Sequence, residues 1–409
     1  MTDSRPIVAV FFGGRSVEHD VSVLTGLQFL AALDQSRYRG LPVYIDPEGR
    51  FWTGERLRRR SAYPITGEGG EDLRPVTFAA GLRAGGRPVL HATRRRLWRE
   101  EVETIPFDIA VPALHGSFGE DGAIQGLFEF ADIPYAGPRL FGAAASMDKH
   151  FTKEILRAAG LPVLPHALLL RPEDHHFVEE AHVLPAVLET LGPDPFPVIV
   201  KPRRLGSSVG VARADGRDAL VAAVNAVFRL DTAALVEPLV PHLVEYNLAV
   251  RREGAALVTS AIERPLKQGE DEVLSFTEKY LAGSGGRPKL DDTPIEGLAE
   301  LSREINPRSL STEQEKNLRN WAKQAFRAFS LTGTARIDFL CNGETGEIWL
   351  NEINSIPGSF AYYLWQVAPV PISFTELTNL LVEEGLLLHR RERRLTDAAA
   401  GGAQIFTRG

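Results

Sequence analysis

The sequence of 409 residues contains one cysteine, Cys341, and only 8 lysines among its 46 basic residues, so 46 − 8 = 38 are arginine. A single thiol excludes an internal disulfide framework and a four-cysteine zinc site, and it is typical of a reducing compartment. No stretch approaches the roughly 18 uninterrupted apolar residues of a membrane span. The first apolar run is too short for a secretory signal. We therefore expect a cytoplasmic protein with no membrane segment.

Excess positive charge is also absent. The 46 basic and 53 acidic residues give 46 − 53 = −7, which argues against a general nucleic-acid binder because such proteins carry a basic footprint. Hydrophobic residues make up 44% and charged residues 24%, as in ordinary globular proteins. At about 100 to 200 residues per domain, the length predicts two to four domains with substantial cores.

The first part of the chain has the pattern of an α/β domain. The apolar run from Ile7 to Phe12 ends at two glycines, and helical spacing follows over 21–33. Further strands are expected at 41–45 and 109–113, which together predict a buried parallel sheet. The stretch 52–105 is rich in arginine and glycine. It fits a solvated insertion with short strands, and a contact surface for a polyanion remains open as the alternative.

Strands and helices continue to alternate along the rest of the chain. Asp218 is the expected N-cap of a helix over 219–228. The polar, then Ala/Gly-rich composition from Arg390 onward predicts a frayed tail. The remaining expected helices span 148–159 and 313–329, and the remaining expected strands span 197–202, 209–212, 234–238, 248–251, 256–262, 335–340 and 347–351.

A glycine-rich loop from Lys201 to Gly210 is the first candidate for chemistry. A strand-borne lysine followed by Gly206, Ser207 and Ser208 offers a cation, hydroxyls and backbone N–H groups, which suit a polyphosphate. A hairpin turn that uses glycine only for its positive φ would have the same residues. Two common nucleotide motifs are excluded, because no lysine follows a glycine and no third glycine follows the first strand in register.

A predicted hairpin near the C-terminus is the second candidate. Alternation along its strands places Arg336 and Asp338 on one face, and Glu352 and Asn354 on one face. If these faces coincide, the three oxygen-bearing side chains could hold Mg²⁺, and the arginine could neutralise developing negative charge. A structural ion-pair cluster around Arg336 is the competing interpretation.

The loop that follows the strand at 109–113 is the third candidate. His115 lies there among glycines, at the carboxyl end of a strand where α/β sheets bind ligands. It could contact a carboxylate or phosphoryl oxygen, or it could be a capping residue without a role in chemistry.

These pieces, in this order, resemble the D-alanine-D-alanine ligases of the ATP-grasp superfamily. The resemblance implies an ATP-grasp fold, α/β with α+β character in its ATP-binding part, preceded by an N-terminal parallel-sheet α/β domain. It implies domains at 1–145, 146–239 and 240–389, then a tail at 390–409. The segments that carry it are 12–22 (FGGRSVEHDVS), 114–122 (LHGSFGEDG), 133–137 (IPYAG), 146–149 (SMDK), 198–210 (VIVKP with GSSVG), 278–280 (EKY), 335–338 (ARID) and 351–358 (NEINSIPG).

The resemblance also implies an ATP site between the second and third domains. It implies that lysines contact the phosphates, that Glu237 and Val240 contact the adenine, and that Glu245 contacts the ribose. The residues implied to bind ATP are Lys149, Lys201, Ser207, Ser208, Glu237, Val240, Glu245 and Lys279.

The implied reaction phosphorylates the carboxylate of one D-amino acid and lets the amine of a second attack the acyl phosphate. D-alanine with D-alanine, for peptidoglycan precursors, is the simplest pair. Magnesium, with manganese as an alternative, would be bound by Asp338, Glu352 and Asn354. The implied catalytic residues are Glu18, Ser207, Tyr280, Arg336 and Gly358, and the implied substrate contacts are Glu18, His115, Arg336, Tyr363 and Leu364.

Departures from the family pattern leave the second substrate open. Tyr363 stands where the family usually has a small hydroxyl residue, and Leu205 stands where an acidic residue is usual. A ligase with another amino acid, a hydroxy acid or an amine as second substrate is therefore the alternative. An inactive nucleotide-binding protein is a further alternative. The resemblance also implies a homodimer and small-molecule amino-acid substrates.

Overall fold

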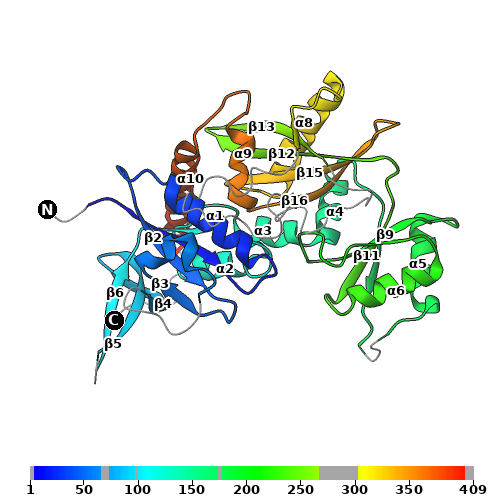
Figure 1. The fold of residues 1–409 in the computed structure, drawn as a ribbon. Helices are drawn as coiled ribbons and strands as arrows, with labels where there is room; N and C mark the ends of the chain where they lie inside the picture. Colours follow the sequence, from blue (N-terminus) through cyan, green and yellow to red (C-terminus); the bar gives the residue numbers. More distant parts are fainter. Residues whose placement is uncertain (1–3, 66–72, 97–98, 174–176, 267–302, 401–409) are drawn as a thin grey trace.

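The computed structural model describes residues 4–65, 73–96, 99–173, 177–266 and 303–400. Within them the strands form three separate sheets, which lie in different parts of the molecule (Figure 1). Lys279 and Tyr280, which the sequence predicts to be site residues, lie outside the described residues. No helix in the described part is long and apolar enough to span a membrane.

The first sheet has seven strands in the order β6-β5-β4-β3-β2-β1-β7. The expected parallel sheet is confirmed for β2-β1-β7, and every residue of β1 is buried. The other four strands pair antiparallel, so the sheet is mixed rather than parallel. The strand bounds are β1 (Ile7–Gly13), β2 (Arg39–Ile45), β3 (Phe51–Thr53), β4 (Arg74–Ala84), β5 (Arg87–Arg96), β6 (Arg99–Pro106) and β7 (Ile109–Pro112).

The arginine-rich stretch is therefore part of the first sheet. Its strands β4, β5 and β6 have 11, 10 and 8 residues, and they are not as short as expected. They pair with one another and extend the sheet beyond β2 and β3. Short helices η1 (Glu55–Arg58) and η2 (Arg60–Ala62) connect β3 to this antiparallel part.

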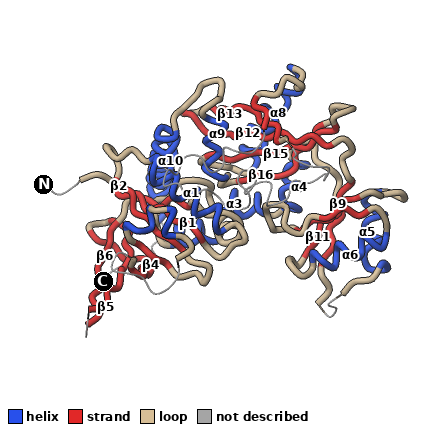
Figure 2. Tube along the Cα trace, viewed as in Figure 1, coloured by secondary structure: helices blue, strands red, loops and turns tan. Residues whose placement is uncertain are grey.

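The second sheet is antiparallel, with strand order β10-β9-β11-β8. Helices α5 and α6 pack against it (Figure 2) and share its apolar core. The N-cap of α6 is Gly216, not the predicted Asp218, and residues 209–211 belong to the loop rather than to a strand. The bounds are β8 (Ala167–Leu170), β9 (Val198–Pro202), β10 (Ala212–Ala214), β11 (Ala233–Pro238), α5 (Glu180–Leu191) and α6 (Arg217–Val227).

The third sheet is antiparallel and has the order β14-β13-β12-β15-β16. Helix α8 begins with a capping box of Ser311 and Gln314, and its apolar face packs on the sheet. The core beneath it also takes in Ala145 of α3 and Leu156 of α4. The bounds are α3 (Leu140–Met147), α4 (Lys149–Ala158), β12 (Leu243–Glu253), β13 (Ala256–Pro265), β14 (Arg303–Ile305), α8 (Thr312–Ala328), β15 (Thr334–Asn342) and β16 (Ile348–Asn354).

The chain then returns to the first sheet. Short helices η3 (Gly358–Ala361) and α9 (Tyr362–Trp365) lead to α10 (Phe374–Ala400). In one core, buried residues from η3, α9 and α10 pack with residues of β1 and of α1 (His19–Ala32). The expectation of a frayed tail was wrong for residues 390–400, because good helix formers such as arginine, leucine and alanine continue α10.

Candidate active site

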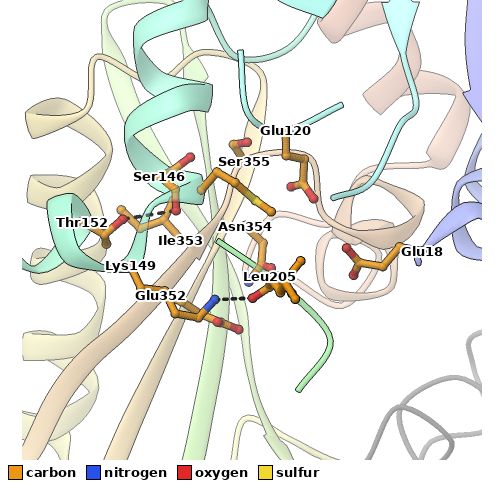
Figure 3. A pocket seen from close by; sticks show the side chains of 12 residues that line it. Glu18, Glu120, Ser146, Lys149, Thr152, Leu205, Glu352, Ile353, Asn354 and Ser355 are labelled. Atoms are coloured by element: carbon orange, nitrogen blue, oxygen red, sulfur yellow. Dashed lines mark hydrogen bonds between the residues drawn. The ribbon is translucent and has the colours of Figure 1, made fainter. Parts of the chain in front are cut away.

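A pocket lies among loops, helix ends and one strand end that come from separate parts of the chain. Glu18 at the start of α1 and Glu120 in the loop before α2 (Ala123–Phe130) come from the part of the chain that forms the first sheet. Lys149 begins α4, and Leu205 and Gly206 belong to the loop after β9. The end of β16 supplies Glu352, Asn354 and the following Ser355. Figure 3 shows these side chains converging from separate segments of the chain.

The hairpin of β15 and β16 confirms the predicted common face. Arg336 pairs with Asn354, and Asp338 pairs with Glu352 across the two strands. The Arg336 guanidinium donates to both carboxylate oxygens of Asp338 at 2.7 Å, and Asn354 Nδ2 donates to Asp338 Oδ2 at 2.9 Å. Although burial opposes the charge, Asp338 raises the pKa of Arg336 well above its usual range. The arginine therefore keeps its positive charge in the site.

The donor set of this hairpin suits a hard cation. Asp338 and Glu352 stand directly opposite each other, where two carboxylates repel unless a positive charge lies near them. Arg336 provides that charge for Asp338. Lys149 lies near Glu352, and although burial lowers the pKa of Lys149, the charge of Glu352 acts against that effect. The oxygens of Asp338, Glu352 and Asn354 are of the kind that Mg²⁺ prefers. These residues could therefore hold a magnesium ion, although the arginine already engages one of them.

Two lysines bind one buried carboxylate beside this hairpin. Glu237, at the end of β11, is 2% exposed, and its Oε2 lies 2.8 Å from Lys201 Nζ. Its Oε1 lies 3.2 Å from Lys153 Nζ, an ion pair that lacks hydrogen-bond alignment. Burial alone would raise the pKa of Glu237, but the charges of Lys153 and Lys201 outweigh it and lower the pKa to about 2.

Sequence reasoning missed Lys153. It lies one helical turn after Lys149 on α4 and is fully buried, and burial lowers its pKa to about 8. The signal was present in the composition, because lysine is rare in this chain and two of the 8 are four residues apart. The structure thus brings Lys149, Lys153 and Lys201 into one region.

The predicted adenine and ribose contacts lie along the connection from β11 to β12. Glu237 faces the two lysines, Val240 is buried, and Glu245 is half-buried on β12. The specific roles of these three residues stay predictions.

Glu18, the residue before α1, contacts the loop after β9. Its side chain accepts a hydrogen bond from Ser207 Oγ, and it is 7% exposed. Two glycines make room for it, because a Cβ on Gly116 would lie 2.6 Å from Glu18 Oε2 and one on Gly206 would lie 3.0 Å from it. Ser207 and Ser208 both have positive φ, at 53° and 58°. The loop is therefore held in an uncommon backbone conformation against Glu18.

Glu120 is a second acidic group of the pocket that sequence reasoning did not select. The backbone N–H groups of Gly116 and Ile356 each donate to it at 3.0 Å. Burial and the neighbouring Glu18 raise the pKa of Glu120 to about 8. The signal available in the sequence was that Glu120 lies within the glycine-rich segment 114–122, which carries part of the family resemblance.

His115 does not line the pocket. It is 4% exposed, its Nε2 lies 2.8 Å from Thr25 Oγ1, and burial lowers its pKa to about 4. The imidazole is therefore neutral near neutral pH. The position of His115 suits a role in holding the neighbouring loop in place. Its direct contact with a substrate stays a prediction.

The predicted second-substrate residues occupy a polar cluster beyond the hairpin. Tyr363 OH donates to Glu263 Oε1 at 2.8 Å, and the Arg303 guanidinium lies 4.2 Å from the centre of the tyrosine ring. Arg303 also pairs with Glu263 at 3.2 Å. Leu364 has no exposed surface and packs in the core of the first sheet, so its predicted contact with a substrate stays a prediction. Gly358 opens η3 beside this cluster.

Comparison with known proteins shows the family to which this chain belongs. Residues 7–138 match the family model for the D-ala D-ala ligase N-terminus, and residues 155–383 match the model for its C-terminus. The chain belongs to the D-alanine-D-alanine ligase family. That family is ATP-dependent, so the predicted dependence on ATP is confirmed at the level of the family.

Individual relatives of the D-alanine-D-alanine ligase family match along nearly the whole chain. The chain is 33% identical over 396 residues to D-alanine-D-alanine ligase A of Bradyrhizobium diazoefficiens, covering 95% of this chain and 97% of that protein. It is 32% identical over 397 residues to the D-alanine-D-alanine ligase of Chloroherpeton thalassium, with the same coverage.

Solved structures confirm the ATP-grasp fold. The D-alanine-D-alanine ligase from Coxiella burnetii matches with a TM-score of 0.76 and 24% identity, over 98% of this chain and 99% of that chain. The VanG D-Ala:D-Ser ligase from Enterococcus faecalis matches with a TM-score of 0.71 and 23% identity, over 93% and 100%.

Proposed function

We propose that this protein is an ATP-dependent ligase that joins two D-amino acids, with D-alanine as the first substrate and D-alanine as the simplest second one. The dipeptide would serve as a peptidoglycan precursor, formed in the cytoplasm. The observation that carries the proposal is the shared face of Arg336, Asp338, Glu352 and Asn354, whose last two residues line the pocket together with Lys149 and Glu18.

The first step would transfer the γ-phosphoryl group of ATP to the carboxylate of the first amino acid. A free carboxylate is a poor electrophile, and phosphorylation gives it a competent leaving group. Lys149 and Lys201 would neutralise the phosphates, and Glu18 would receive the ammonium group of the amino acid. Magnesium or manganese, held by Asp338, Glu352 and Asn354, would neutralise the charge of the phosphate groups.

The second step would be attack of the second amine on the acyl phosphate. Arg336, whose charge is permanent in this site, and the N–H group of Gly358 would stabilise the oxyanion. The roles that the resemblance implies for Lys279 and Tyr280 fall outside the described residues. Exclusion of water from the site would protect the acyl phosphate from hydrolysis. Phosphate would leave as the peptide bond forms.

A different second substrate is the specific alternative. The Tyr363 hydroxyl is already hydrogen-bonded to Glu263, and Arg303 lies over the ring. A bulky phenol in this setting leaves less room than a small hydroxyl residue would. The structural relative named a D-Ala:D-Ser ligase illustrates a second substrate other than D-alanine in a protein of this fold.

The decisive experiment is ADP release measured with a panel of D- and L-amino acids, hydroxy acids and amines. We expect turnover with D-alanine alone and a D-alanyl-D-alanine product. Turnover that requires an unrelated second substrate, with no response to D-alanine, would contradict the leading proposal and support the alternative. ATP binding without turnover on any member would instead support an inactive nucleotide-binding protein.

Two substitutions test the residues. We expect Lys201→Ala and Glu352→Ala to abolish phosphoryl transfer while circular dichroism shows a folded protein, because each removes a charge aimed at the phosphate region. Glu347→Ala, at an exposed position next to the same strand, is the matched control and should retain activity. Full activity in both site variants would remove the proposed site. A homodimer, which the family resemblance implies, would be tested by sedimentation of the full chain.

A further inference from the structure

A second cluster of metal-ligating side chains lies outside the pocket. His150 and Glu154 project from α4, and His166 lies just before β8. One ligand atom from each residue lies within 4.8 Å of the others. His150 Nδ1 is 2.9 Å from His166 Nε2, and that nitrogen is 3.8 Å from Glu154 Oε1. None of the three lines the pocket, although Lys149 and Thr152 on the same helix do.

The helix arranges two of these groups for joint coordination. Residues four positions apart lie one above the other on the same face of a helix, so His150 and Glu154 present an imidazole and a carboxylate side by side. His166 completes a third corner from a different segment of the chain. In a tetrahedral zinc site with bonds of about 2.0 to 2.1 Å, neighbouring ligand atoms are separated by about 3.3 Å. The observed separations of 2.9 Å and 3.8 Å fall on either side of this value.

The burial of His166 holds one candidate ligand in place. Its side chain is 2% exposed. Among the described residues its buried Nδ1 has no hydrogen-bond partner, and its Nε2 faces only another imidazole and the more distant Glu154. The 2.9 Å contact between the two imidazoles is a hydrogen bond, so zinc binding would displace the proton that the two nitrogens share.

We propose that His150, Glu154 and His166 bind one Zn²⁺ ion, with a fourth coordination position left for water. Two imidazoles and one carboxylate form a known type of zinc ligand set, whereas magnesium favours oxygen ligands alone. This site would therefore differ in metal preference from the oxygen-rich hairpin of Asp338 and Glu352. Arg157 also contacts Glu154, but both of those side chains are 45% exposed, so the arginine can turn into solvent.

The test is zinc binding to the full-length, untagged protein after removal of metal with a chelator. Binding is measured by competition with a chromogenic zinc chelator in excess Mg²⁺, which occupies the oxygen ligands of the hairpin. We expect one tight equivalent of zinc per chain. His150→Ala and Glu154→Gln should each weaken binding by about tenfold or more, since even loss of an outer-shell partner can have that effect.

A matched control variant distinguishes zinc binding at this site from zinc binding by other histidines of the chain. His242 lies 3.2 Å from Glu344, an exposed histidine-carboxylate pair without a third ligand. His242→Asn should leave the tight equivalent unchanged. The substituted side chains on α4 are partly exposed, so these variants are expected to fold, and their melting temperatures without metal provide the check. The buried His166 needs no substitution in this design.

Cobalt(II) gives a second readout. Bound in place of zinc, it should produce the visible absorption of a tetrahedral site in the wild type and in His242→Asn, and not in His150→Ala. The proposal is overturned if the wild type binds zinc no more tightly than His150→Ala does. It is equally overturned if His242→Asn removes the tight equivalent.

Discussion

Glu237→Gln should destabilise the protein strongly, because this carboxylate holds two buried lysines. The change preserves the shape of the side chain and removes its charge. In the native protein the pKa of Glu237 is lowered from 4.5 to about 2. At about 1.4 kcal/mol per pKa unit, a difference of roughly 2.5 units corresponds to about 3 kcal/mol. No allowance for solvent screening is needed, since the residue is 2% exposed.

The sign of the pH dependence follows from the lowered pKa. A carboxylate with a lowered pKa in the folded state stabilises the protein above its unfolded value of 4.5, and this contribution is lost as the pH falls toward 2. The difference in unfolding free energy between the parent and Glu237→Gln should therefore be largest near neutral pH and should shrink in acid. A variant that lost only packing would show the same difference at every pH.

A double-mutant cycle separates the ion pair from other effects. With Glu237 neutral, Lys153 becomes a buried charge with its 3.2 Å partner removed. Lys153→Met should then change the unfolding free energy more favourably in the Glu237→Gln protein than in the parent. The difference between the two effects, the coupling energy, should be about 1 to 3 kcal/mol.

The assay is urea unfolding followed by circular dichroism at neutral and acidic pH. Glu189→Gln, an exposed glutamate on α5, is the control and should change the unfolding free energy by no more than about 0.5 kcal/mol. The reasoning is refuted if Glu237→Gln costs less than about 1 kcal/mol at neutral pH. Additive effects of the two substitutions would refute it as well.

Two further predictions concern the loops around Glu18. Gly116→Ala should lower the turnover number, because the added Cβ would lie 2.6 Å from Glu18 Oε2. Gly254→Ala is the control, since Gly254 also has a positive φ but a Cβ added there would meet no atom within 4 Å. This control should cost only about 1 kcal/mol of stability. Equal activity in both variants would contradict this reasoning. For Glu120, the pKa raised from 4.5 to about 8 gives a contribution to stability that is present below 4.5 and lost as the pH rises through 8. Glu120→Gln should therefore gain stability relative to the parent, measured by thermal unfolding, as the pH is raised across this range, and a constant difference would exclude the raised pKa.

The hairpin shows what could be predicted from the sequence alone. Strict alternation along two short apolar strands fixes which side chains share a face, and the turn between them leaves few possible registers. The common face of each strand followed from that local pattern, and the structure shows the register that brings the two faces together, with Asp338 opposite Glu352. The same holds for the parallel strands around β1, whose continuous apolar sequence indicates burial on both faces.

Other features depend on contacts that no local pattern encodes. The strands over 74–106 contain many arginines, and their length comes from pairing with one another and with β3. The burial of Lys153 depends on Glu237, which is 84 positions away in the sequence. The local sequence of α4 does not show that Lys153 is buried, since an ionised side chain is buried only when a distant partner is supplied.

The two interpretations of the Arg336 cluster turn out to be compatible. The Arg336 guanidinium holds both oxygens of Asp338, while Asn354 holds one of them from the neighbouring strand. Orientation by such contacts is what a ligand for a metal ion requires, because a carboxylate that is already held loses little freedom on binding. The arginine also keeps its own charge through the same pair, so it remains available to stabilise negative charge on a substrate. A structural ion pair is therefore the physical basis on which this hairpin could perform both of its proposed functional roles.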